Sequence, residues 1–161
     1  PEGDALCAAA ASGDVDALTA ALLSDQSDVP PSPNTNTPLI WAADNGHLEA
    51  VTTLLSSHPA SMANINARGY LGATAVSRAA RKGHASVLSA LLSAGASPDI
   101  GNDKRQYPMH FSAFKLHPEC VDVLLEHGAS TYVLDRKGRT PAEDTSDEGI
   151  RAAILKARKA R

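Results

Sequence analysis

Aromatic residues, cysteines and long hydrophobic runs are all scarce in this sequence, and each scarcity excludes a class of protein. Six aromatic residues (one Trp, three Tyr, two Phe) account for 4% of the 161 residues. The two cysteines, Cys7 and Cys120, cannot build the disulfide framework of a small secreted domain, so we expect an intracellular protein, cytoplasmic or nuclear. No hydrophobic run is long enough to cross a bilayer, so we expect no membrane span.

Basic residues are absent from the first part of the chain. Residues 1–67 contain no Lys or Arg, and all 15 basic residues lie in residues 68–161. The net charge of −3 does not favour nucleic acid as a partner. If order along the sequence is also order in space, one end of the molecule is negative and the other positive. A ligand with the opposite polarity along its length would fit that arrangement.

A repeated helix–turn–helix pattern runs through the sequence. In residues 37–55, Thr37 and Pro38 suit the start of a helix, Gly46 suits a turn, and apolar residues then recur at helical spacing. The pattern returns at Thr74, Tyr107 and Thr140, which are spaced by 33 residues, and another copy precedes Gly13. One such unit is too small to bury its own apolar face, so we expect the copies to stack.

A 33-residue helix–turn–helix unit with a Thr-Pro-Leu-His-x-Ala core is typical of ankyrin repeats. The chain resembles this family through Gly-x-Thr-Pro at 138–141, Gly-His at 46–47 and 83–84, and Leu-Leu-x-x-Gly-Ala at 91–96 and 124–129. The resemblance implies an all-α ankyrin-repeat solenoid of helix–turn–helix units with finger loops. We expect one ankyrin-repeat domain over residues 1–161, with repeats at about 4–34, 35–71, 72–104, 105–137 and 138–161.

Several positions depart from the family pattern. Ser77 stands where the family has His, and Tyr107 stands where it has Thr. Leu116 replaces the turn glycine and Pro118 follows it, so we expect that turn to be reshaped. Three prolines in residues 28–36 favour an extended loop in place of a regular finger.

Catalytic and metal-binding patterns find no support, so we expect neither an enzyme nor a cofactor. The sequence has no phosphate-binding glycine loop, no nucleophile elbow and no plausible carboxylate pair. His47, His84 and His117 recur one place after each turn, at the repeat spacing. The resemblance implies that they are structural hydrogen-bonding residues and not metal ligands.

The resemblance also implies that finger loops and first helices line a concave groove, which is the usual binding face. Two positions on each first helix, together with the finger tips, face this groove. The candidate binding residues are Trp41, Asp44, Tyr70, Leu71, Arg78, Arg81, Lys104, Phe111, Phe114 and Arg136. Exposed aromatic side chains flanked by Arg are typical of interface hot spots. We expect a monomer that binds a protein or peptide with acidic and hydrophobic residues.

Other interpretations stay open at this stage. Phe111 and Phe114 could pack on each other, or on Arg78 and Arg81, and merely stiffen the groove. The chain starts with Pro1 and not Met, so it could be the targeting or regulatory ankyrin domain of a larger enzyme or channel. It could also read a modified lysine, with Trp41, Asp44 and Tyr70 forming part of an aromatic cage.

Overall fold

The structure is a computed structural model that describes residues 2–24, 35–59, 61 and 64–160. Residues 28–34 of the expected extended loop lie outside these residues. Within the described part of the chain, the regular secondary structure is helical and includes no strand. The predicted all-α stack of helix–turn–helix units is therefore confirmed.

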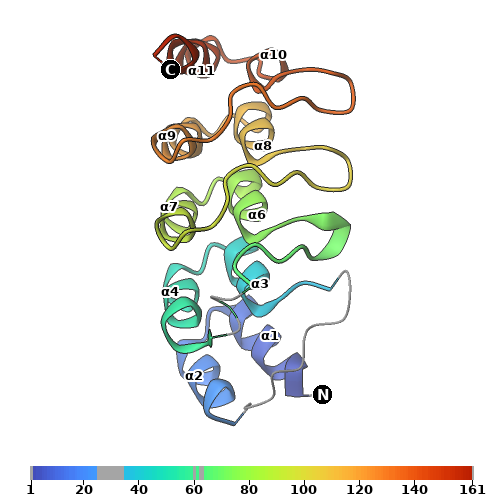
Figure 1. Cartoon of the computed structure of the whole chain (residues 1–161). Coiled ribbons are helices and arrows are strands. Elements are labelled where there is room, and N and C mark those ends of the chain that lie inside the picture. Colours follow the sequence, from blue (N-terminus) through green and yellow to red (C-terminus); the bar gives the residue numbers. More distant parts are fainter. Residues whose placement is uncertain (1, 25–34, 60, 62–63, 161) are drawn as a thin grey trace.

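Two parallel columns of helices build the molecule (Figure 1). The first helix of each pair belongs to one column: α1 (Glu2–Ser12), α3 (Pro38–Asp44), α6 (Ala75–Lys82), α8 (Pro108–Phe114) and α10 (Pro141–Asp144). The second helices form the other: α2 (Val15–Ser24), α4 (Leu48–Ser57), α7 (Ala85–Ser93), α9 (Pro118–Glu126) and α11 (Glu148–Lys159). Each helix contacts its partner and its column neighbours. The two termini therefore lie at opposite ends of the stack.

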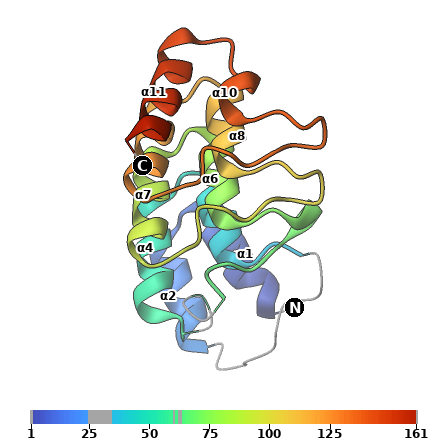
Figure 2. The same cartoon turned by 45° about the horizontal axis from the view of Figure 1, so that its top comes forward.

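Finger loops extend from the side of the first helices, away from the second helices (Figures 1 and 2). The 3-10 turn η1 (Tyr70–Gly72) forms the tip of one finger. In three successive fingers, the N–H groups of Gly72, Arg105 and Gly138 donate to the carbonyl three residues earlier, at 2.9–3.0 Å. These tight turns give each finger tip a defined local conformation.

Local capping and small residues explain the first helices. The Oγ1 atom of Thr37 accepts a hydrogen bond from the Ile40 N–H at 3.2 Å, and Pro38 occupies the first helical position, where its missing N–H costs nothing. Thr74 caps α6 in the same way, accepting from the Ser77 N–H at 3.1 Å. Fully buried alanine pairs, 42–43 in α3 and 79–80 in α6, allow neighbouring first helices to pack closely.

The repeated histidines join each repeat to the one before it. The Nε2 atom of His47 lies 3.0 Å from the Ala11 carbonyl oxygen, and that of His84 lies 3.1 Å from the Asp44 carbonyl oxygen. His117 makes the same contact with the Arg81 carbonyl oxygen at 3.2 Å. A carbonyl can only accept, so each Nε2 carries the proton and donates. The structural role expected for these three histidines is confirmed.

The turn at Leu116 is not reshaped, contrary to the expectation from the sequence. Leu116 has φ = 61°, close to the φ = 80° of Gly83 at the equivalent turn. The His117 N–H donates to the Ser112 carbonyl at 2.9 Å, as the His84 N–H does to Ala79 at 3.0 Å. A leucine side chain is accommodated because no histidine of a following repeat packs over this turn, where Leu116 is about half exposed.

Replacing Leu116 with Gly should stabilise the protein. A left-handed conformation costs a non-glycine residue about 1–2 kcal/mol, and part of this is offset by the greater freedom of glycine in the unfolded chain. We expect a gain of about 1 kcal/mol in the free energy of unfolding, measured by urea denaturation. A loss of stability would show that the exposed leucine makes contacts worth more than the strain.

The cysteines do not pair with each other. Cys7 lies in α1 and Cys120 in α9, and no disulfide joins them. Cys120 is fully buried, and this burial, together with the negative charge of Glu119, raises the pKa of its thiol to about 11. The side chain therefore stays a neutral core thiol near neutral pH. Among the described residues, each helix is too short or too polar to cross a membrane.

Candidate functional site

Equivalent positions on three successive first helices form a continuous row, which we call the first-helix stripe. Its members are Trp41, Asp44, Arg78, Arg81, Phe111 and Phe114. Within each helix the two members are one turn apart, so they share a face. Between helices they connect diagonally, Asp44 to Arg78 and Arg81 to Phe111. The structure therefore brings the six predicted first-helix residues onto one surface.

The aromatic members of the stripe reach solvent to different degrees. Trp41 is 38% exposed and Phe114 is 58% exposed. Phe111 is partly covered, because the Arg81 guanidinium carbon lies 5.8 Å from its ring centroid. Phe114 has the Lys115 ammonium 5.6 Å from its centroid. The stiffening interpretation thus has some support at Phe111, where Arg81 covers the ring, and less at Phe114, which stays open to a partner.

Arg78 and Asp44 are engaged with each other. Arg78 Nη1 lies 3.7 Å from Asp44 Oδ1, and Nη2–H donates to the Tyr70 carbonyl at 3.4 Å. The side chains of Arg78 and Asp44 are only 15% and 17% exposed. The 3.7 Å separation makes an ion pair but no close hydrogen bond, since Asp44 Oδ1 has no such partner in the described chain. Arg78 therefore has less guanidinium surface to offer a ligand than Arg81.

The finger-tip candidates fall into two groups. Tyr70, Leu71 and Lys104 are exposed. Arg136 reaches back to the preceding finger, where its Nη2–H donates to the Asp103 carbonyl at 2.9 Å. Arg68, which the sequence did not single out, pairs with the Asp103 carboxylate at 3.2 Å. Asp103 thus links three fingers, and Arg136 serves the scaffold as well as the surface.

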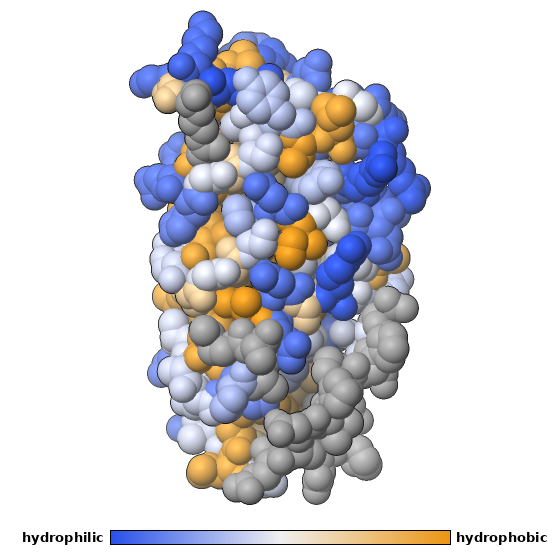
Figure 3. Space-filling model, in the orientation of Figure 1, coloured by the Kyte–Doolittle hydropathy of each residue, from blue (hydrophilic) through white to orange (hydrophobic). Residues whose placement is uncertain are grey.

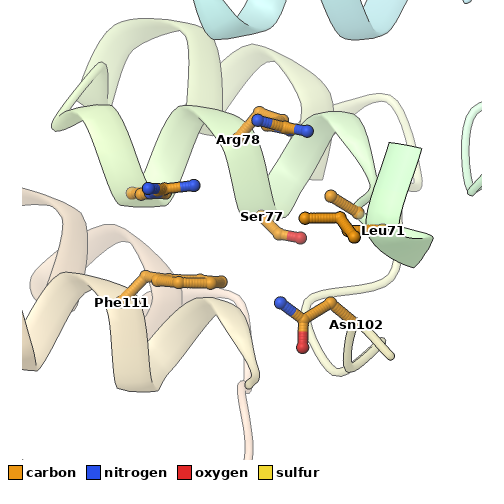
Figure 4. A pocket seen from close by; sticks show the side chains of 7 residues that line it. Leu71, Ser77, Arg78, Asn102 and Phe111 are labelled. Carbon is orange, nitrogen blue, oxygen red and sulfur yellow. The ribbon is translucent and has the colours of Figure 1, made fainter. Parts of the chain in front are cut away.

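A shallow hollow opens between α6, α8 and two fingers. Its lining consists of Leu71, Ala73, Ser77, Arg78, Arg81, Asn102 and Phe111. Figure 4 shows the Phe111 ring and the side chains of Leu71, Ser77 and Asn102 around one shared space. Ser77, Ala73 and Asn102 were not predicted as site residues. The replacement of the family's His by Ser77 was the signal that could have identified them.

Exposed basic side chains lie on the fingers beside this hollow. Lys104, Arg105 and Lys137 are exposed on successive fingers. In the view of Figure 3, the finger edge of the upper half of the molecule is strongly hydrophilic.

Farther along the stack, the Asp135 carboxylate binds the Arg139 guanidinium at 2.8 Å, and the same guanidinium lies 2.8 Å from Asp144. Burial alone would raise the pKa of Asp135, but hydrogen bonds from Arg139 and the Lys137 N–H outweigh it and lower that pKa.

The geometry does not assemble an aromatic cage or a metal centre within the described residues. A cage needs converging rings, and Trp41 and Tyr70 make no ring contact with each other there. Asp44, the expected anionic member, is paired with Arg78. No group of three or more His, Cys, Asp or Glu side chains in that part of the chain could hold a metal ion. The arrangement instead offers apolar and cationic surface.

Three known proteins show where similar sequences occur. The potassium channel AKT2/3 of Arabidopsis thaliana is 40% identical over 58 residues, which are 36% of this chain and 7% of the channel. The E3 ubiquitin-protein ligase XBAT33 of Arabidopsis thaliana is 32% identical over 122 residues, 75% of this chain and 23% of the ligase. The ankyrin repeat and KH domain-containing protein 1 of Homo sapiens is 33% identical over 111 residues, 67% of this chain and 4% of that protein. The chain thus spans less than a quarter of each.

A family model described as ankyrin repeats (3 copies) matches residues 2–69 and again residues 76–150, most of the chain. Ankyrin repeats are protein–protein interaction modules, and the fold itself is non-catalytic. This match agrees with the structure, which has the helix pairs, the finger loops and the repeat-joining histidines expected of ankyrin repeats. The chain belongs to the ankyrin-repeat family.

Proposed function

We propose that this chain is a non-catalytic binding module whose first-helix stripe holds a peptide or protein segment with acidic and apolar side chains. We also propose that residues 1–161 are one monomeric ankyrin-repeat domain with the repeat boundaries expected from the sequence. The observation that carries it is that one stripe holds two solvent-exposed aromatic side chains, Trp41 and Phe114, and between them the exposed cation Arg81, which contacts the Phe111 ring. No reactive group accompanies them.

The energetics favour this use of the surface. Covering a large aromatic side chain that is open to water contributes strongly to the free energy of binding. Truncating such a hot-spot residue typically costs about 2 kcal/mol of binding free energy or more. Arg81 has no carboxylate within ion-pair distance in the described chain, whereas Arg78 already has Asp44. A carboxylate of the partner is the natural ligand for Arg81, because Arg binds carboxylates through paired hydrogen bonds.

Selection from a random-peptide display library tests the proposal, followed by affinity measurement on the tightest peptide. We expect the selected peptides to combine apolar residues with Asp or Glu. Trp41→Ala and Phe114→Ala should each weaken binding about 30-fold, equivalent to the 2 kcal/mol of a hot spot, with little change in thermal midpoint. Leu155→Ala is a matched control, since Leu155 is 39% exposed like Trp41 but lies on α11.

Two results would contradict the proposal. One is a set of selected peptides without acidic residues. The other is a loss of affinity in Leu155→Ala as large as that in the two aromatic variants. A marked loss of stability in Trp41→Ala and Phe114→Ala would also assign these rings to the scaffold.

A second candidate function is that the same surface serves as the targeting or regulatory domain of a larger enzyme or channel. The observation that favours it is the similarity to segments of a protein named as a potassium channel and another named as an E3 ubiquitin-protein ligase. The open reading frame that encodes this chain decides between the two. A catalytic or channel domain in the same frame supports the second function, and its absence refutes it.

A further inference from the structure

The hollow beside the stripe exists because one repeat has a short side chain at a position that others fill. Ile40, Ser77 and His110 each occupy the third residue after the N-cap of their first helix. Ile40 and His110 are large and almost fully buried, and the His110 Nε2–H donates to the Arg139 carbonyl of the next finger at 2.9 Å. The Ser77 hydroxyl turns back instead, accepting from the Thr74 N–H at 3.3 Å. Space is therefore left between α6 and the next finger.

One wall of this hollow is a leucine in an unfavourable backbone conformation. Leu71 has φ = 58° and ψ = 24°, and Gly72 after it has φ = 70°. Two successive left-handed residues form the type of turn that favours Asn-Gly, so leucine costs conformational energy here. Its side chain is 43% exposed and lines the hollow.

The floor and walls offer few unused polar groups. Asn102 is occupied within its own finger, where its Oδ1 accepts from the Lys104 and Gln106 N–H groups at 3.0 and 2.9 Å and its Nδ2–H donates to Gln106 Oε1 at 3.0 Å. Leu71, Ala73 and the Phe111 ring are apolar. Arg81 stands at the rim without an ion-pair partner in the described chain. The result is a mainly apolar recess with two guanidinium groups in its lining, that of Arg81 and that of Arg78, whose Nε has no hydrogen-bond partner in the described chain.

We propose that this recess is the specificity subsite of the groove and receives one aliphatic side chain of the bound peptide, next to an Asp or Glu that pairs with Arg81. The inference rests on the proposed function and specifies where one residue of the bound peptide lies along the groove. The hollow is shallow and open along the groove, and its mainly apolar lining suits one aliphatic side chain of a bound peptide better than an enclosed small molecule. The positive charge of Arg81 at the rim favours an Asp or Glu next to that aliphatic residue of the peptide.

The test uses the tightest peptide from the display library and two variants that change the recess in different ways. Leu71→Asn removes the apolar wall but suits the turn, so affinity should fall about tenfold or more while the thermal midpoint is unchanged or rises by about 2–4 °C. Ser77→Ile fills the recess with the residue found at position 40 and should weaken binding similarly. Leu134→Asn makes the same chemical change on another finger and should leave the affinity unchanged.

A peptide in which the aliphatic residue is replaced by Ala completes the design. It should bind wild type about tenfold more weakly, yet lose little further affinity for Leu71→Asn, because the two changes remove the same contact. If Leu71→Asn and Ser77→Ile bind like wild type while Trp41→Ala and Phe114→Ala still lose affinity, the subsite is refuted and the proposed function stands. If no peptide is selected, or the aromatic variants bind normally, both proposals fail.

Discussion

Replacing Gly46 with Ala is expected to lower the free energy of unfolding by about 3 kcal/mol. Gly46 has φ = 75°, and a Cβ atom there would lie 2.6 Å from Nδ1 of the His84 ring. The histidine cannot move away without losing its hydrogen bond to the Asp44 carbonyl. The substitution therefore combines backbone strain with a clash at the interface between two repeats. Urea denaturation followed by circular dichroism measures the loss.

Gly128 provides a control that separates the two causes. Its φ of 78° matches that of Gly46, but a Cβ atom there would meet nothing within 4 Å. Gly128→Ala should cost only the conformational part, about 1 kcal/mol. In a His84→Ala background, the loss in the free energy of unfolding caused by Gly46→Ala should fall to the same value, because the clashing ring is gone. Equal losses for Gly46→Ala and Gly128→Ala would show that the histidine ring adjusts freely.

Replacing Asp44 with Ala is expected to cost about 3 kcal/mol, because it leaves the Arg78 charge largely buried beside an apolar methyl group. The two side chains are 17% and 15% exposed, and the charged atoms lie 3.7 Å apart between α3 and α6. Arg78→Met should cost a similar amount by leaving the Asp44 carboxylate unpaired. Chemical denaturation of the single variants measures both effects.

The double variant Asp44→Leu/Arg78→Met tests whether the charges or the packing matter. Replacing both members of a buried ion pair by apolar residues is often neutral or stabilising, so the double variant should be more stable than either single variant. The single variants Asp44→Leu and Arg78→Met complete a double-mutant cycle with it, and this cycle measures the coupling. Single effects that simply add would show that the two side chains act independently at their separation of 3.7 Å.

The engagement of Arg78 also refines which cations are available to a partner. The predicted groove contains four basic residues, and the structure occupies two of them within the chain, Arg78 through Asp44 and Arg136 through the Asp103 carbonyl. Arg81 and Lys104 are left with exposed side chains and no ion pair within the described residues. A bound carboxylate should therefore lie near the Phe111 end of the stripe, where Arg81 meets the recess.

The sequence predicted the local structure where one residue type serves one backbone need. Thr37 and Thr74 cap helices as expected, and Gly46 and Gly83 take the left-handed turn conformation. Leu116 takes the same left-handed conformation without being glycine, because whether a side chain fits at such a turn depends on whether the next repeat places a ring over it. That information lies 34 or more residues away along the chain and has no local signature.

The repeat spacing and the resemblance to ankyrin repeats together predicted the helical stack, the structural histidines and the six first-helix residues of the stripe, since similar units pack in similar ways. The tertiary structure alone decided which of these residues are available. Asp44 and Arg78 differ in position within the repeat and meet diagonally between α3 and α6. The recess likewise depends on Ser77, Leu71 and Phe111, which come from different elements of two repeats. Pairing and free space depend on side-chain length and direction across repeats, which periodicity does not encode.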